Sequence, residues 1–255
     1  YAPFLSYLQQ YQLRHALTPS QVADWLQVAL WAGQDDEVVK IWRRYQVYMP
    51  LPARGTAAAA QALRNQKQWQ ASLLLWQQAL SQSPDSDDYR IGYIKTLADA
   101  RKDGEALSEA RRLVAEQASV AHLQTLSYVY LRLGKSWDQL LVDTQILDPA
   151  FGLANSVELT PAEKRNLQLN AAAELVRLAD TPSREENARY ALARTALAQY
   201  DAMIAAWRPD PQAAPDITRA RIDRLGALYA NADYAQIIRE YQSLLAQQQV
   251  VPDWA

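Results

Sequence analysis

Several residue types and motifs that define common protein classes are missing from this chain. It has no cysteine, which excludes disulfides and thiolate sites and leaves the redox compartment open. Only two histidines, His15 and His122, are present, and they stand far apart in the sequence. No Gly-rich phosphate loop or Gly-x-Ser-x-Gly motif occurs. We therefore expect no metal, no cofactor and no enzymatic activity.

Glycine, long apolar runs and charge of one sign are also scarce. Seven glycines in 255 residues, frequent Ala, Leu and Gln, and the lack of sustained alternation predict an all-α fold. A net charge of −2 without a Lys/Arg block argues against nucleic acid as the main partner. No stretch approaches the roughly 18 apolar residues of a membrane span. The chain opens without Met or a signal core, so we expect a piece of a longer protein.

Paired carboxylates occur only at turns and expected helix starts. Asp35-Asp36, Asp87-Asp88 and Glu185-Glu186 are such pairs. Capping and the helix dipole account for carboxylates in this position, because the first backbone N–H groups of a helix lack internal partners. We therefore interpret them as structural, not as the facing pair that a glycosidase needs.

What the chain does have is a period of 34 residues, that of tetratricopeptide (TPR) repeats. Trp42 and Trp76 are 34 residues apart, as are Pro50 and Pro84, and the same step connects Val38, Ser72, Ala106 and Leu140. One repeat of two helices cannot bury its apolar face alone, so repeats stack and present a surface. The predicted fold is an all-α, TPR-like helical-repeat solenoid, a right-handed superhelix of antiparallel helix pairs.

The period divides the chain into three regions. Residues 1–149 are predicted to hold a partial leading helix and about four TPR-like repeats, with a capped helix start at Thr18-Pro19. Residues 150–215 are predicted to form a loop and a helix pair that departs from the repeat, with a capping box at Thr160 and a helix through Trp207 longer than a TPR helix. Residues 216–255 are predicted to regain the repeat at Leu225-Gly226-x-x-Tyr229 and to begin a truncated further one.

Eight tryptophans are an unusual number, and aromatic faces can stack on sugar rings. Four of them occupy inter-helix packing positions of the repeat and are interpreted as core: Trp42, Trp69, Trp76 and Trp137. Trp31 falls near the inner face of a first helix, where packing is the more common role and ligand contact the alternative.

The first helices of a TPR stack line its concave surface, so stepping by 34 along them gives a candidate binding face. Polar residues dominate it, and a merely solvated surface is an equally good interpretation. If the face binds, its amides, single aromatic and isolated charges suit a hydroxylated, partly cationic sugar chain, with Asp99 meeting an ammonium group. The predicted binding residues are Gln27, Trp31, Gln61, Arg64, Asn65, Lys95, Asp99 and Arg132.

Several segments give a more specific indication than the repeat pattern. The segments are Gln21 to Asp35, Leu51-Pro52-Ala53-Arg54-Gly55, Gln68-Trp69-Gln70, Ala173 to Leu178, Pro182-Ser183-Arg184, Ala198-Gln199-Tyr200 and Leu225 to Leu228. In these the chain resembles the periplasmic TPR region of the outer-membrane exporters of poly-β-1,6-N-acetyl-D-glucosamine, a biofilm polysaccharide. The similarity extends from about residue 20 to the end.

The resemblance implies a non-catalytic periplasmic scaffold that docks the periplasmic lipoprotein deacetylating the polymer. It also implies guidance of the partly deacetylated polymer to a pore, formed in that family by a C-terminal outer-membrane β-barrel that we expect to be absent from this piece of sequence. Two alternatives stay open. One is lectin-like polysaccharide binding without a protein partner. The other is a TPR adaptor that holds a protein or peptide tail through a carboxylate clamp, for which Arg64, Lys95 and Arg132 come near the required places.

Overall fold

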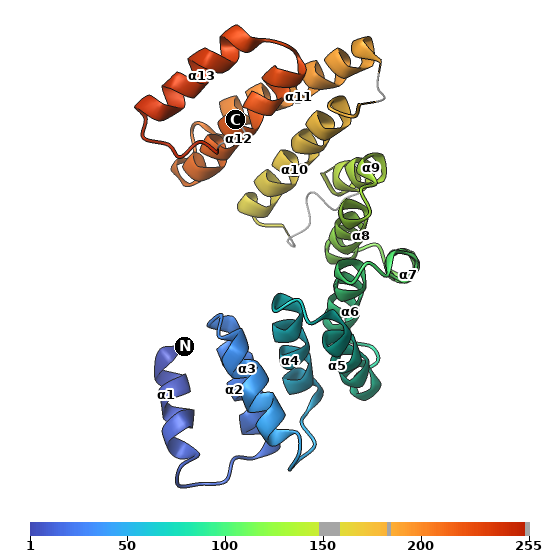
Figure 1. Cartoon of the computed structure of the whole chain (residues 1–255), viewed down its shortest axis with the longest axis vertical. Coiled ribbons are helices and arrows are strands. Elements are labelled where there is room, and N and C mark those ends of the chain that lie inside the picture. The colour runs from blue at the N-terminus through green and yellow to red at the C-terminus, as the bar shows by residue number, and fades with distance from the viewer. Residues whose placement is uncertain (148–158, 183–184, 253–255) are drawn as a thin grey trace. The chain divides into compact units, whose positions relative to one another are not determined.

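The computed structural model describes residues 1–147, 159–182 and 185–252. Within these ranges the chain forms thirteen α-helices and one short 3-10 helix, with no strand (Figure 1). The all-α, helical-repeat fold predicted from the sequence is therefore confirmed. The chain divides into two compact parts, an N-terminal part (Tyr1–Glu116) and a C-terminal part (Gln117–Ala255).

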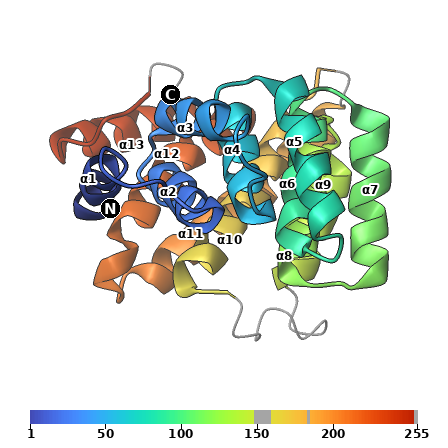
Figure 2. The ribbon, with the colours of Figure 1, turned by 90° about the horizontal axis from the view of Figure 1, so that it is seen from below.

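The N-terminal part contains a leading helix and three helix pairs. Helix α1 (Ala2–Tyr11) precedes the pairs. Each first helix packs on its own second helix, and each of the first two pairs packs on the first helix of the next pair. Figure 2 shows the last of these helices, α5, α6 and α7, side by side. The pairs are α2 (Pro19–Trp31) with α3 (Asp35–Tyr45), α4 (Ala53–Asn65) with α5 (Trp69–Gln82), and α6 (Asp87–Asp99) with α7 (Asp103–Glu116).

The C-terminal part begins and ends with a pair and has two longer helices between them. The first pair is α8 (Val120–Arg132) with α9 (Ser136–Leu147), and the last is α12 (Ala214–Ala230) with α13 (Tyr234–Ala246). Between them lie α10 (Pro161–Ala179) and α11 (Glu186–Trp207), and the 3-10 helix η2 (Pro211–Ala213) precedes α12. As predicted, α11 is longer than any helix of the pairs. The loop predicted at 150–159 lies almost entirely outside the described residues.

Local sequence explains where the helices begin. The side chain of Thr18 accepts a hydrogen bond from the backbone N–H of Gln21, whose own side chain accepts one from the Thr18 backbone. Thr160 and Glu163 form the same capping box at α10. Each box satisfies N–H groups that have no partner inside the helix, and a proline occupies the first helical position of both helices. Both predicted helix starts are confirmed.

The turn inside each pair fixes the register of the repeats. In every pair one residue has a positive φ, and we call it the turn residue: Gly33, Lys67, Arg101, Gly134 or Ala232. The first three are spaced by 34, but Gly134 follows Arg101 by 33. The uniform step to Leu140 is therefore wrong by one residue. Gln139 takes the buried position of Val38, Ser72 and Ala106, while Leu140 is only half-buried.

The packing of the N-terminal part depends on tryptophan and on small residues. Trp76 is buried, and its indole Nε1–H donates a 3.0 Å hydrogen bond to Thr96 Oγ1. A methyl group built on Gly55 would lie 3.0 Å from Ala23 Cβ, so α2 and α4 approach closely there. The inter-repeat role predicted for Trp76 is therefore confirmed, and Trp42 and Trp69 are half-buried.

One tryptophan of the C-terminal part does not have the predicted position. Trp137 is 52% exposed, so its interpretation as core is wrong, because the shortened step moves it away from the position of Trp69. Tyr229, in the segment where the repeat was predicted to resume, is 55% exposed, while the neighbouring Leu228 is buried. The predicted boundaries after residues 149 and 215 remain predictions.

Candidate functional site

The predicted binding residues all lie at three positions relative to the turn residue. Gln27, Gln61 and Lys95 precede it by six residues, and Arg64 precedes it by three. The other four precede it by two residues: Trp31, Asn65, Asp99 and Arg132. We call these three positions the first-helix face, which lies on α2, α4 and α6 in the N-terminal part and, separately, on α8 and α12 in the C-terminal part. The shortened step places Arg132 at the position of Asp99, not at that of Arg64, and assigns it to the C-terminal part.

Amide groups near the end of α4 connect adjacent repeats; Gln61 and Asn65 belong to this face, and Gln66 follows directly after the helix. Gln61 Nε2 donates to Asn65 Oδ1 at 2.8 Å, and Asn65 Nδ2 donates to Asp35 Oδ1 at 3.0 Å. Gln66 Nε2 donates to Asp36 Oδ1 at 2.9 Å. Because their neighbours fix them, these side chains hold defined orientations.

A salt bridge lies beside the amides. Arg64 Nε contacts Asp99 Oδ2 at 2.7 Å, and the side chains of Arg64 and Asp99 are 16% and 9% exposed. Lys95 lies close by, and its pKa is lowered, first by burial and then by the Arg64 guanidinium. An ammonium group approaching Asp99 would therefore have to compete with Arg64, which weakens the role predicted for this carboxylate.

The acidic start of α3 adjoins the amides, and the sequence interpretation did not connect the two. Asp35, Asp36 and Glu37 lie in the first turn of α3, and the preceding residue, Gln34, makes no side-chain cap. They line an open polar hollow of about 550 Å³, together with Lys40 and other residues. Asp35 and Asp36 accept hydrogen bonds from side-chain amides of the next repeat. The hollow therefore places acidic groups beside Asn65 and Gln66.

Trp31 is the one aromatic residue among the predicted binding residues. Its side chain is 60% exposed, and its ring centroid lies 6.1 Å from that of Tyr1. The exposure removes Trp31 from the core, and its contact with a ligand stays a prediction. Gln27 is half-buried on the same helix.

A buried polar cluster lies in the C-terminal part, where sequence reasoning placed no functional residue. Asp143 is buried at the position that Trp42 and Trp76 occupy in earlier repeats, and Ser127 Oγ donates to its Oδ1 at 2.6 Å. Burial raises the pKa of Asp143 most strongly, hydrogen bonds from Ser127 and Gln139 oppose this, and the nearby Glu174 adds to it. Gln139 is buried beside it, and its Oε1 has no hydrogen-bond partner. The cluster could have been found only with the correct repeat register.

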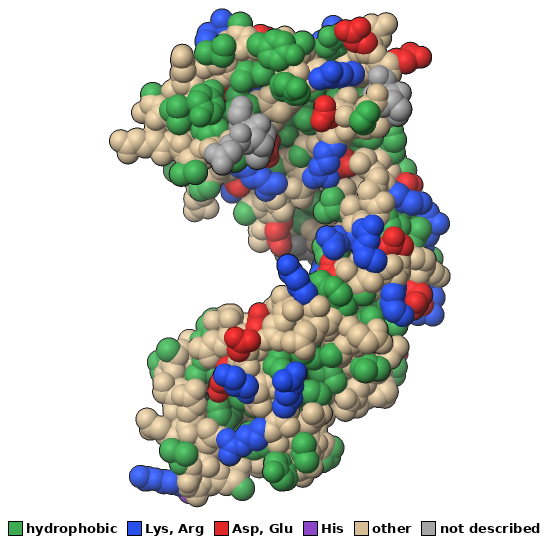
Figure 3. All heavy atoms as spheres, viewed as in Figure 1, with side chains coloured by type: hydrophobic (Ala, Val, Ile, Leu, Met, Phe, Trp, Pro, Cys, Tyr) green, Lys and Arg blue, Asp and Glu red, His purple; other side chains and the backbone are tan. Residues whose placement is uncertain are grey.

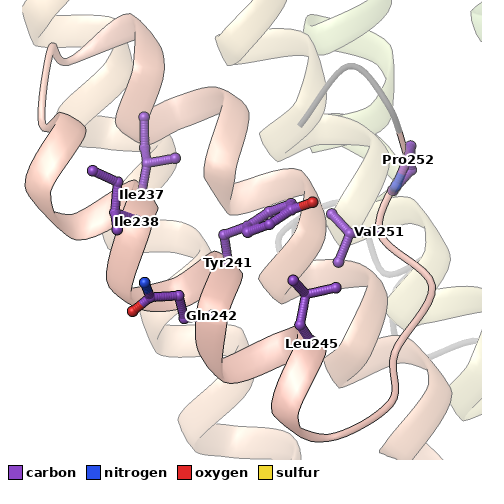
Figure 4. Close-up of a pocket in the computed structure, with 7 residues that line it drawn as sticks. All are labelled: Ile237, Ile238, Tyr241, Gln242, Leu245, Val251 and Pro252. Carbon is purple, nitrogen blue, oxygen red and sulfur yellow. The ribbon is translucent and has the colours of Figure 1, made fainter.

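An open apolar groove of about 620 Å³ follows the outer side of α13 (Figure 4). Ile238, Tyr241 and Leu245 come from α13, and the Tyr241 side chain points toward Val251. In the earlier repeats the position of Ile238 is held by Val39 and Leu73, both only 4% exposed where the next helix packs. The groove therefore resembles a surface on which another repeat packs. Its mostly apolar side chains offer few hydrogen-bonding groups to a sugar.

Charged side chains of both signs occur together on the face that Figure 3 draws. Among the described residues, no group of three or more His, Cys, Asp or Glu side chains could hold a metal ion. The described helices include none with both the length and the apolar character to cross a membrane.

Known proteins with similar sequences are exporters of a polysaccharide. The chain is 41% identical over 266 residues to the poly-beta-1,6-N-acetyl-D-glucosamine export protein of Escherichia coli K12. The match covers 97% of this chain and 32% of that protein, and the relative in Escherichia coli O157:H7 gives the same values. The chain thus spans about a third of the length of these relatives. No family model matches it. The resemblance inferred from the sequence segments is confirmed.

Proposed function

We propose that this chain, a relative of the poly-β-1,6-N-acetyl-D-glucosamine export proteins, is a non-catalytic scaffold that acts in the export of that polymer. The observation that carries the proposal is 41% identity across almost the whole chain. Stacked helix pairs agree with it, because a repeat stack presents an extended surface in place of an enclosed catalytic pocket.

The first-helix face is the proposed surface for the polymer. Hydroxyl and acetamide groups of a sugar need hydrogen-bond donors and acceptors, which Gln61, Asn65 and Gln66 supply. A deacetylated sugar carries an ammonium group, and the carboxylates of Asp35 and Asp36 lie beside these amides. Partly deacetylated polymer should therefore bind more tightly than fully acetylated polymer.

The finer parts of the proposal concern partners and location. We place the chain in the periplasm as part of an outer-membrane protein, where it docks the polysaccharide deacetylase and guides the polymer to the β-barrel pore. Identity to export proteins supports this arrangement. The TPR-adaptor alternative is less favoured, because Arg64 already pairs with Asp99.

Two titrations test the proposal. The chain is titrated by calorimetry with partly deacetylated β-1,6-linked glucosamine oligomers and, separately, with the purified deacetylase. The variant Gln61→Ala/Asn65→Ala should weaken oligomer binding about thirtyfold, since it removes two hydrogen-bonding side chains of about 1 kcal/mol each. Gln70→Ala/Gln78→Ala on the exposed side of α5 is the matched control. If neither ligand binds the parent chain, the scaffold role is wrong.

A further inference from the structure

A second candidate binding site lies in the C-terminal part, between the ends of α10, α12 and α13. It is a cleft of about 480 Å³. Tyr229, near the end of α12, and Tyr234, at the start of α13, form one side of it, while Asp180 and Arg177 come from the end of α10. Leu225 and Ile237 add apolar surface to the lining. The cleft is distinct from the apolar groove on the outer side of α13, although Ile237 contributes to both.

The repeat register places this cleft on the first-helix face. Tyr229 precedes the turn residue Ala232 by three residues, as Arg64 precedes Lys67. Gly226 precedes Ala232 by six, the position of Gln27, Gln61 and Lys95 in earlier repeats. The last pair thus carries a glycine and a tyrosine where α4 carries a glutamine and an arginine. At these two positions the last pair therefore presents no side chain in place of an amide, and an aromatic ring in place of a guanidinium group.

The two tyrosines are exposed although they are large and partly apolar. Tyr229 is 55% exposed and Tyr234 is 58% exposed, with ring centroids 6.2 Å apart in an edge-to-face arrangement. Each ring offers an apolar face with a hydroxyl at its edge, a combination suited to ligands that are apolar on one side and polar at the rim. A pyranose ring in a β-linked chain has this character, with C–H groups on its faces and hydroxyls around its edge.

The charges around the cleft indicate which sugar it prefers. Arg177 pairs with Glu174, which is 1% exposed, so a buried carboxylate balances the guanidinium. Asp180 is exposed at the end of α10 and lines the same cleft. A carboxylate beside two aromatic faces is complementary to a sugar that carries an ammonium group.

We propose that this cleft is a binding subsite for glucosamine residues of a β-linked oligosaccharide, with a sugar ring on Tyr229 and Tyr234 and its ammonium group at Asp180. The inference rests on the proposed function, because that function supplies the polymer. It adds a named site in the C-terminal part, which none of the residues predicted from the sequence occupies.

The test compares oligomer binding to the full chain and its variants by calorimetry. Tyr229→Ala/Tyr234→Ala should weaken binding of partly deacetylated β-1,6-glucosamine oligomers at least tenfold. Tyr48→Ala is the matched control, because that tyrosine is 80% exposed in the N-terminal part. Asp180→Asn should abolish the preference for deacetylated over acetylated oligomers at this site. Circular dichroism confirms that each variant is folded.

The outcomes separate this inference from the proposed function. If the parent binds oligomer and the double variant binds within twofold of it, the cleft is not a sugar subsite, while the proposed function stands. If the double variant loses the deacetylase and keeps the oligomer, the cleft is a protein-docking site and the inference is wrong. If the parent binds no oligomer, the polymer-guiding function itself fails and the subsite fails with it.

Discussion

Trp76 is the residue on which the packing of the N-terminal part depends most. Its ring lies over Gly92 of α6, its indole N–H binds Thr96, and it is 4% exposed. Trp76→Ala should lower the free energy of unfolding by about 3 to 5 kcal/mol, as for other large core truncations. Urea denaturation measures this, and an unchanged midpoint would show that the indole contributes nothing to packing.

Gly92 tests the same contact from the opposite side. A β-carbon at this position would lie 2.4 Å from Trp76 Cζ2, so Gly92→Ala should force the ring or the helix to move. We expect a loss of about 1 to 3 kcal/mol. Gly104→Ala is the control, because nothing lies within 4 Å of its β-carbon and alanine favours helix, so this variant should not lose stability. Equal effects of both changes would contradict the contact.

Asp143 gives a prediction about pH. Its pKa is raised above the usual value by burial, so the folded chain binds this proton more tightly than the unfolded chain. The stability due to the protonated form is present below the unfolded pKa of about 3.9 and is lost as pH rises through the higher folded pKa. Asp143→Asn should therefore be more stable than the parent at neutral pH, with the difference vanishing in acid.

Thermal melts between acid and neutral pH measure this difference. Asp138→Asn, an exposed aspartate on the same helix, controls for the loss of one negative charge. If the parent instead becomes more stable than Asp143→Asn as the pH rises from acid to neutral, the ionised buried carboxylate stabilises the fold. That result would contradict the prediction.

At the scale of helices, the turn residue defines the register of the pairs. The pattern of apolar residues in the sequence predicted the pairs and most of their starts, because spacing and capping are local properties. It did not show the shorter step before Gly134, since Trp137 and Leu140 still fit a period of 34. Trp137, Leu140 and Arg132 were therefore assigned one residue out of register, and Asp143 was overlooked.

The turn residues also predict a stability effect. Ala232 has φ of 59°, a conformation that costs a residue with a β-carbon about 1 kcal/mol relative to glycine. Ala232→Gly should therefore raise the free energy of unfolding by about 1 kcal/mol. Gly134→Ala should lower it by a similar amount, since φ is 68° there and nothing lies within 4 Å of the added β-carbon. Changes of the same sign in both variants would contradict this interpretation.

At the scale of the whole molecule, the sequence predicted the fold class and the relationship to the export proteins. It gave less information about which side chains surround the proposed binding residues. The period alone placed the amides of α4 and Asp99 on one predicted face, and their role in binding stays a prediction. The partners that hold the amides were not identified, because Asp35 and Asp36 look like ordinary helix-start carboxylates until α4 is packed against α3. The tyrosine cleft was missed for a similar reason, since it needs the ends of three helices.

The central claim is that the first-helix face binds the partly deacetylated polymer. Backbone amide NMR of the full chain, recorded as partly deacetylated β-1,6-glucosamine oligomers are added, tests it most directly. The account predicts shift changes concentrated at the ends of α2, α4 and α6, at the start of α3 and around Tyr229 and Tyr234, and smaller changes with acetylated oligomers. Changes confined to the exposed sides of α5 and α7, or no changes at all, would contradict it.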